Sequence, residues 1–240
     1  MKKKIFDIEK KKFIIGTYGD AGILVLTKFF EINVAFKNII VFTHNNKVNK
    51  RFINFLKMYK LKYIFDNQKI GYIKKSFHNF KPNFFISCYF RKKIKPDLLN
   101  LKGCYSINMH PSLLPRYAGC FSNCWNILNK ESYTGVSFHF LNEKFDSGNI
   151  IMQKRIKIQK NDTAFSLHYK LINLACQNLY NLFEYLYLKS PKGRKQNLKK
   201  RSYYFRKLPY SGKTKKNWSI AMKKNFNRAM YFPPFDFRKI

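Results

Sequence analysis

The stretch "INMHPSLLPRYAG", residues 107–119, places Asn108 and His110 two positions apart and then turns through two prolines. On an extended chain, residues two apart point to the same face. Pro111 favours an extended exit from the strand, and Pro115 stiffens the turn that follows. A strand that needed only to be buried has no reason to end on Asn-x-His, so we predict that this strand end carries chemistry.

Short apolar runs alternate with helix-like segments on both sides of this stretch. Apolar runs of this length predict buried strands, and apolar residues spaced three or four apart predict helices. The predicted strands are residues 13–19, 38–44, 63–65, 82–90, 104–110, 134–141 and 149–158. This alternation predicts an α/β fold with a doubly wound, mostly parallel sheet. Ligands of such sheets bind at the carboxyl ends of the strands, where Asn108 and His110 stand.

The second half of the chain has two predicted helices and a basic tail. Residues 120–130 predict a helix with Ser122 as its N-cap, and residues 162–188 predict one long amphipathic helix. Asp162 or Thr163 caps the long helix. Residues 189–216 contain twelve Lys or Arg and no acidic residue. We therefore predict a catalytic domain over residues 1–188, and a basic linker and C-terminal extension over residues 189–240.

Composition limits the class of protein. The chain has 240 residues, 45% of them hydrophobic. Its mean hydropathy is −0.41. No apolar run approaches the roughly 18 residues of a membrane span, so we expect a cytoplasmic protein without membrane contact. The five cysteines form no Cys-x-x-Cys pair, which favours reduced thiols and no metal site. The net charge of +36 suits nucleic acid, but it also follows from a composition encoded by A/T-rich codons.

A carboxylate completes a candidate site. Asp146 lies in "NEKFDSG", a tight turn between two predicted strands. An amide, an imidazole and a carboxylate together suit acyl transfer to an amine. The imidazole accepts a proton, the carboxylate orients it, and the amide donates to the developing oxyanion. The plainer interpretation makes Asp146 a turn residue and His110 a capping group, and we interpret His139 and His168 as structural.

The combination of "NMHPSLLPRYAG" and "TGVSFHFLNEKFDSGNIIMQ" resembles the folate-dependent formyltransferase family, whose members carry Asn-x-His-x-Ser-x-Leu-Pro and then an Asp-x-Gly loop. The resemblance implies 10-formyltetrahydrofolate as the formyl donor, held and activated by Asn108 and His110. Asp146 would position His110 and take part in proton transfer. The pterin would lie against residues 87–96 and the Asp146 loop. The donor-binding residues implied in this way are Tyr89, Ile94, Ser112, Leu114 and Gly148.

The end of the chain suggests the acceptor. "YYFRKLPYSGKTKKNW" resembles the extension of the sugar-nucleotide N-formyltransferases, which implies an amino-sugar nucleotide as the acceptor. Methionyl-tRNA formyltransferases continue as a tRNA-binding barrel, for which this chain stops early. Initiator tRNA, gripped by the basic tail instead, remains an alternative acceptor. A formyltetrahydrofolate hydrolase and a non-enzymatic nucleic-acid-binding protein are further alternatives, and a homodimer stays open.

Overall fold

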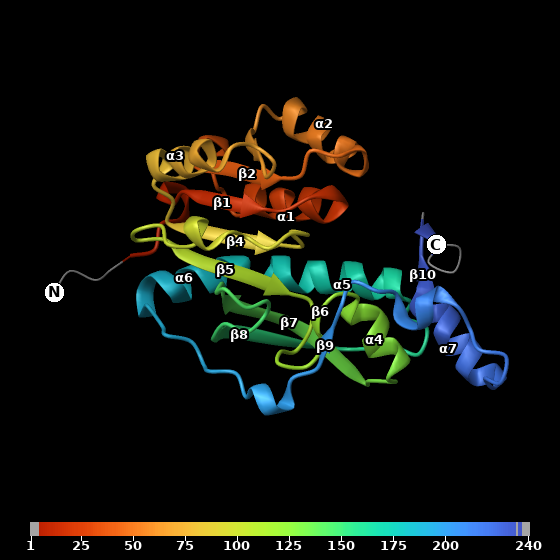
Figure 1. Cartoon of the computed structure of the whole chain (residues 1–240). Helices are drawn as coiled ribbons and strands as arrows, with labels where there is room; N and C mark the ends of the chain where they lie inside the picture. Colours follow the sequence, from red (N-terminus) through yellow and green to blue (C-terminus); the bar gives the residue numbers. More distant parts are fainter. Residues whose placement is uncertain (1–4, 234, 237–240) are drawn as a thin grey trace.

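The computed structural model describes residues 5–233 and 235–236 and contains a seven-stranded sheet. The strand order is β3-β2-β1-β4-β5-β7-β8, with the first five strands parallel and the last two antiparallel (Figure 1). The predicted α/β fold and mostly parallel sheet are confirmed. The strands are β1 (Phe13–Gly16), β2 (Ile39–Thr43), β3 (Lys62–Phe65), β4 (Phe84–Cys88), β5 (Tyr105–His110), β7 (Tyr133–Phe140) and β8 (Ile150–Lys157).

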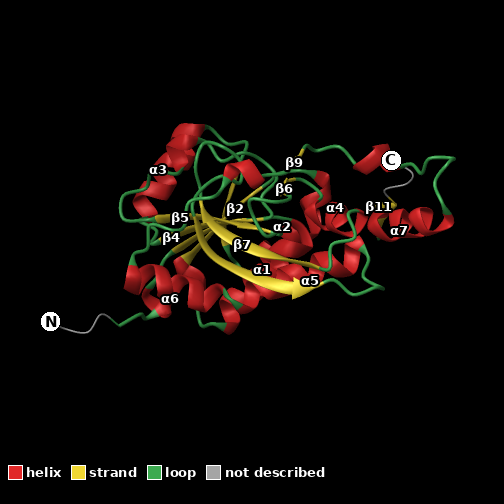
Figure 2. Cartoon of the chain, turned by 90° about the horizontal axis from the view of Figure 1, so that it is seen from below, coloured by secondary structure: helices red, strands yellow, loops and turns green. Residues whose placement is uncertain are grey.

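Helices cover both faces of this sheet (Figure 2). They are α1 (Gly19–Glu31), α2 (Lys50–Met58), α3 (Ile70–Phe80), α4 (Ser122–Leu128), α5 (Ala164–Gln177), α6 (Leu179–Lys189) and α7 (Ile220–Met230). Short strands lie outside the main sheet as β6 (Ala118–Gly119), β9 (Tyr203–Tyr204), β10 (Tyr231–Phe232) and β11 (Phe235–Asp236). Among the described residues, no helix is long and apolar enough to cross a membrane.

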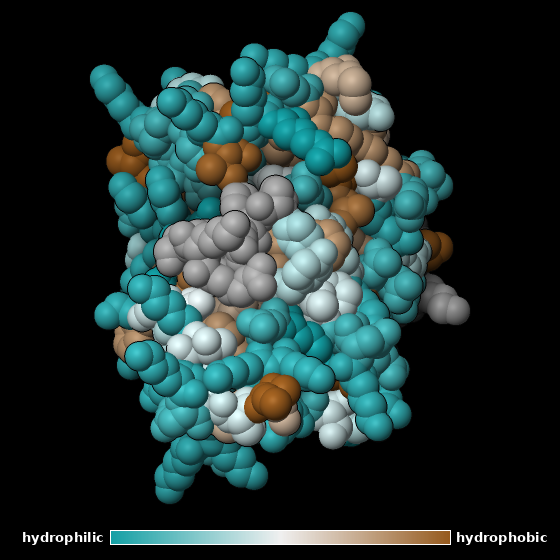
Figure 3. Space-filling view, turned by 90° about the vertical axis from the view of Figure 1, so that its right-hand side faces the viewer, coloured by the Kyte–Doolittle hydropathy of each residue, from teal (hydrophilic) through white to brown (hydrophobic). Residues whose placement is uncertain are grey.

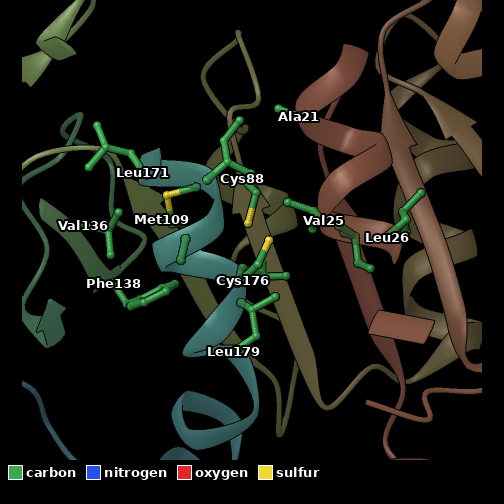
Figure 4. Packing of buried hydrophobic residues seen from close by; sticks show 14 of the residues in the cluster. Ala21, Val25, Leu26, Cys88, Met109, Val136, Phe138, Leu171, Cys176 and Leu179 are labelled. Atoms are coloured by element: carbon green, nitrogen blue, oxygen red, sulfur yellow. The ribbon is translucent and has the colours of Figure 1, made fainter. Parts of the chain in front are cut away.

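Alternation along the strands divides the core into two layers. Phe13 and Ile15 face one side, where they pack with residues of α1, α5 and α6, whereas Ile14 packs on the other side with residues of α3. Figure 4 shows part of the first layer, with Leu171 and Cys176 of α5 beside buried residues of α1 and the strands. With both faces covered by helices, the strand ends are where polar side chains can gather.

Two helix predictions differ from the structure. The predicted helix over residues 162–188 is two helices, because the chain leaves helical geometry at Asn178, whose side-chain amide donates to the Leu174 carbonyl. The predicted cap at Ser122 is wrong. The N-cap is Phe121, and the Ser122 hydroxyl donates instead to the Pro111 carbonyl at 2.9 Å. The cap at Thr163 is confirmed as a capping box.

The basic segment after α6 runs back along the molecule to β9 (Figure 1). Most of its lysines are exposed, and hydrophilic side chains cover much of the face in Figure 3. The segment nevertheless makes specific contacts. Arg194 pairs with Ile150 of β8, β9 pairs in parallel with β6, and Gln196 is buried. Phe226 of α7 joins the larger core layer.

Candidate active site

The end of β5 lies between β4 and the antiparallel β7. In this register Asn108 is opposite His139, and His110 is opposite Ser137. Asn108 and His110 therefore share a face of the sheet, as their spacing predicts. Asn108 is half-buried and His110 is buried.

Asp146 reaches this strand end from the turn between β7 and β8. Its Oδ2 accepts a hydrogen bond from the Gly119 N–H at 2.8 Å and lies 3.5 Å from His110 Nδ1. Its Oδ1 lies 3.4 Å from Asn108 Nδ2. The three predicted catalytic side chains, which come from separate parts of the sequence, thus meet at one point.

The turn that carries Asp146 is held in an unusual shape. Asp146 has a φ of +51°, a left-handed conformation that Asp adopts more readily than most residues. A Cβ at Gly148 would lie 1.8 Å from the Phe140 carbonyl oxygen, so only glycine fits there. The side-chain amide of Gln196 donates to the carbonyls of Asp146 and Gly148, at 3.0 and 2.7 Å. Sequence reasoning missed Gln196, because nothing local marks a residue that lies so far along the chain.

The surroundings of Asp146 keep it ionised. Burial by itself raises the pKa of this carboxyl, but the neighbouring imidazoles of His110 and His139, together with the hydrogen bond from the Gly119 N–H, act more strongly in the opposite direction. The pKa of Asp146 is therefore held well below its usual range. At neutral pH the site contains a nearly buried carboxylate.

His110 is oriented by the loop that follows it. Its Nε2 lies 2.8 Å from the Tyr117 carbonyl oxygen, which can only accept, so Nε2 carries a proton. Nδ1 is left as the nitrogen that faces Asp146. The Ser112 hydroxyl donates to the Arg116 carbonyl at 2.8 Å, inside the same loop. Leu114 is buried as well, so the side chains of Ser112 and Leu114 shape the loop, and their contact with a formyl donor stays a prediction.

Tyr89 and Ile94 follow β4, the neighbour of β5, and the structure places them differently. Tyr89 has a φ of +59°, and its buried hydroxyl has no hydrogen-bond partner among the described residues. Such strain and such an unpaired group are more frequent at functional sites. Burial raises the pKa of Tyr89 well above its usual value. The Tyr89 ring packs against the His168 ring, and burial lowers the pKa of His168 to about 4. Ile94 packs into the second core layer.

A second His–Asp pair, also missed from sequence, contacts the loop that follows β4. His44 at the end of β2 lies 3.1 Å from Asp66 at the end of β3, and both side chains are buried. His44 Nε2 accepts a hydrogen bond from the Arg91 N–H at 3.2 Å, and Lys92 pairs with Asp66 at 2.5 Å. Within residues 5–233 and 235–236, no three His, Cys, Asp or Glu side chains are placed to hold a metal ion.

Residues 34–181 match the family model described as formyl transferase. The chain belongs to the formyl transferase family. The matched segment contains the strand end with Asn108 and His110 and the Asp146 turn, so the resemblance seen in the sequence is confirmed.

Some of the proteins that this chain resembles are sugar N-formyltransferases. Over 159 residues the chain is 43% identical to a GDP-perosamine N-formyltransferase of Brucella melitensis, covering 65% of this chain and 60% of that protein. The aligned part thus spans less than two thirds of that relative. The chain is also similar to a solved N-formyltransferase from Helicobacter canadensis in complex with folinic acid and dTDP-3-aminofucose. The TM-score is 0.72 and the identity 22%, covering 92% of this chain and 81% of the other, a likeness of fold.

Proposed function

We propose that this chain transfers a formyl group from 10-formyltetrahydrofolate to the primary amine of an amino-sugar nucleotide. The observation that carries the proposal is the meeting of Asn108, His110 and Asp146 at the carboxyl end of β5. The similarity to a GDP-perosamine N-formyltransferase supports the acceptor class. We also propose the division into a catalytic domain and a basic extension, with the boundary near residue 188.

The reaction sets clear demands on the site. A bond forms between the acceptor nitrogen and the formyl carbon, and the bond between that carbon and the donor nitrogen breaks. The acceptor amine loses one proton, and the donor nitrogen gains one. The protein must therefore supply a hydrogen-bond donor for the formyl oxygen and a group that takes up and returns a proton.

The residues present fit a formyl donor. Asn108 is half-buried, and its amide N–H can donate a hydrogen bond to the formyl oxygen. The Asp146 carboxylate beside it can only accept hydrogen bonds, so it cannot bind that oxygen. The loop around Tyr89 and the loops that contain Ser112 and Gly148 would hold the rest of the donor. Ile94 and Leu114 would act from beneath, as buried supports of the two loops.

Each polar side chain then has a role. Asn108 donates to the formyl oxygen as negative charge develops on it. The His110–Asp146 pair takes up the proton of the amine, since Nδ1 of His110 is the nitrogen that Tyr117 leaves free. Asp146, ionised at neutral pH, stabilises the resulting imidazolium across 3.5 Å. The Gly119 N–H keeps the carboxylate in place.

The test is a donor-turnover assay with 10-formyltetrahydrofolate and a panel of amino-sugar nucleotides, read by mass spectrometry of the acceptor. We expect a formylated sugar nucleotide, and a loss of turnover of at least ~100-fold in Asn108→Ala and in His110→Ala. Near wild-type turnover in either folded variant overturns the site. Formylation of charged initiator tRNA in place of every sugar nucleotide overturns the acceptor class and leaves the site standing.

A further inference from the structure

His139 lies directly against the catalytic amide. It is 1% exposed and sits opposite Asn108 in the β5–β7 register. Its Nε2 lies 3.1 Å from Asn108 Nδ2 and 3.6 Å from Asp146 Oδ1. On the other side of the ring, Nδ1 lies 2.9 Å from the Phe140 carbonyl oxygen. A histidine that only filled space would need none of these polar contacts.

For a neutral His139 ring, the contacts allow one assignment of hydrogens. A carbonyl oxygen can only accept, so His139 Nδ1 carries the proton that Phe140 receives. With the proton on Nδ1, Nε2 offers a lone pair and accepts from the Asn108 amide nitrogen. Flipping the Asn108 amide would place its oxygen against that lone pair and against the Asp146 carboxylate, two contacts between acceptors. The Phe140 carbonyl thus sets the tautomer of His139, and His139 sets the orientation of Asn108.

This orientation decides which hydrogen Asn108 can offer to a ligand. Its amide nitrogen has two N–H groups, and the shorter contact, 3.1 Å, ties one of them to His139. The other faces Asp146 Oδ1 at 3.4 Å, a longer and weaker contact that a ligand oxygen can replace. We propose that His139 is a positioning residue, which holds Asn108 so that its second N–H is available to the formyl oxygen. The inference rests on the proposed function only in naming that oxygen.

A packing role and a positioning role make different demands. Packing needs the volume of the side chain, whereas positioning needs an acceptor at the place of Nε2. His139→Gln keeps an acceptor oxygen near that place. His139→Met keeps a comparable volume without a comparable acceptor and leaves one Asn108 N–H unpaired. His139→Leu is a second acceptor-free variant should His139→Met not fold, and His78→Gln, on the exposed side of α3, is the matched control.

Two measurements test the proposal. In steady-state assays we expect the variant that lacks a hydrogen-bond acceptor at position 139 to lose about 100-fold in kcat, the scale for losing an oxyanion donor. The KM for the sugar nucleotide should change little. The kcat of His139→Gln should be at least about tenfold higher than that of His139→Met. In ¹⁵N–¹H spectra of the ligand-free protein, the Asn108 side-chain signals, assigned by their absence in Asn108→Ala, should shift in the acceptor-free variant and stay close to wild type in His139→Gln.

The outcomes separate the inference from the proposed function. If His139→Gln and His139→Met (or His139→Leu) lose the same factor in kcat, the positioning role is overturned. Wild-type turnover in His139→Met or His139→Leu also overturns it. The spectra need no substrate, so they decide the orientation of Asn108 even if no sugar nucleotide is formylated. An Asn108 amide signal that is the same in all variants also overturns the proposal.

Discussion

Replacement of Asp146 by Asn is the sharpest perturbation of this site. The change keeps the size of the side chain, and Asn tolerates the left-handed backbone at this position as well as Asp does. The new amide can keep its oxygen toward the Gly119 N–H. Its NH₂ group then faces the Asn108 N–H across the former 3.4 Å contact, and His110 loses the opposing charge. The fold should survive, and the chemistry should not.

The structure bounds both effects. A hydrogen bond to a charged group contributes about 1.5–3 kcal/mol and a neutral one about 0.5–1.5 kcal/mol, so we expect Asp146→Asn to destabilise the fold by about 1–2 kcal/mol. For a chain of this size, that lowers the melting temperature by roughly 2–8 °C. Loss of the charge that stabilises a protonated His110 should lower kcat by about 10²–10⁴-fold, or about 2.7–5.4 kcal/mol in the barrier.

The assay compares Asp146→Asn with Asp97→Asn. Asp97 is an exposed carboxylate that pairs with Lys74 and makes no hydrogen bond or ion pair with Asn108, His110 or Asp146, so its replacement should leave turnover unchanged. Initial rates of formyl transfer and thermal unfolding are measured for both variants. A folded Asp146→Asn protein with near wild-type kcat would refute the reasoning and make Asp146 a turn residue only.

The stability of the same variant should depend on pH in one direction. The pKa of Asp146 is lowered in the folded protein, so its contribution to stability is present above the ordinary carboxyl pKa of about 3.9. It is lost as the pH falls through the lower, folded value. The difference in melting temperature between wild type and Asp146→Asn should therefore be full at pH 7 and should narrow below about pH 4.

Three further predictions use other features of the fold. Gly148→Ala should destabilise by about 1–3 kcal/mol and impair turnover, because its Cβ meets the Phe140 carbonyl, whereas Gly71→Ala, with open space in α3, should stabilise by about 0.5–1 kcal/mol in urea unfolding. Burial lowers the pKa of His168 to about 4, so the unfolded chain binds more protons between about pH 6.5 and 4 and stability falls as pH falls through that window. His168→Leu should remove up to about 3 kcal/mol of that pH dependence, read from urea midpoints at pH 7 and 4.5. In a plot of the logarithm of the KM for the sugar nucleotide against the logarithm of the salt concentration, we expect the shallow slope of one or two charge contacts. A steep slope, to which each of many phosphate contacts adds about 0.9 in magnitude, would indicate a nucleic-acid substrate.

The strands and the placing of Asn108 and His110 on one face at a strand end were predictable because their signals are local. A buried parallel strand is a short apolar run, and two polar residues at alternate positions of its end share a face whatever surrounds them. The pair Asn108 and His110 therefore needed no tertiary information. Asp146 was predictable as a turn residue, and only its combination with the other two made it a candidate for catalysis.

The partners of these residues were not predictable, because tertiary register supplies them. His139 meets Asn108 through the antiparallel pairing of β5 with β7, and its place in an alternating strand gives the same pattern as a packing residue. The Tyr117 carbonyl and the Gly119 N–H are backbone groups, on which residue type has little bearing. The break at Asn178 was hidden because both helices present apolar residues to the same core.

The basic extension shows how composition misleads about position. Its lysines mark it as an exposed linker, yet its backbone and a few neutral side chains hold the site together. Tyr203–Tyr204 pair with the strand that presents the Gly119 N–H, and Gln196 binds the carbonyls on either side of the Asp146 turn. Residues beyond position 188 therefore support Asp146 in two ways. Gln196 binds its backbone carbonyl directly, and Tyr203–Tyr204 pair with the strand of Gly119, whose N–H binds the Asp146 carboxylate. The proposed boundary near residue 188 therefore marks a change in charge, and the segment after it still supports the site, because charge reports which side chains face water and says nothing of what the backbone between them binds.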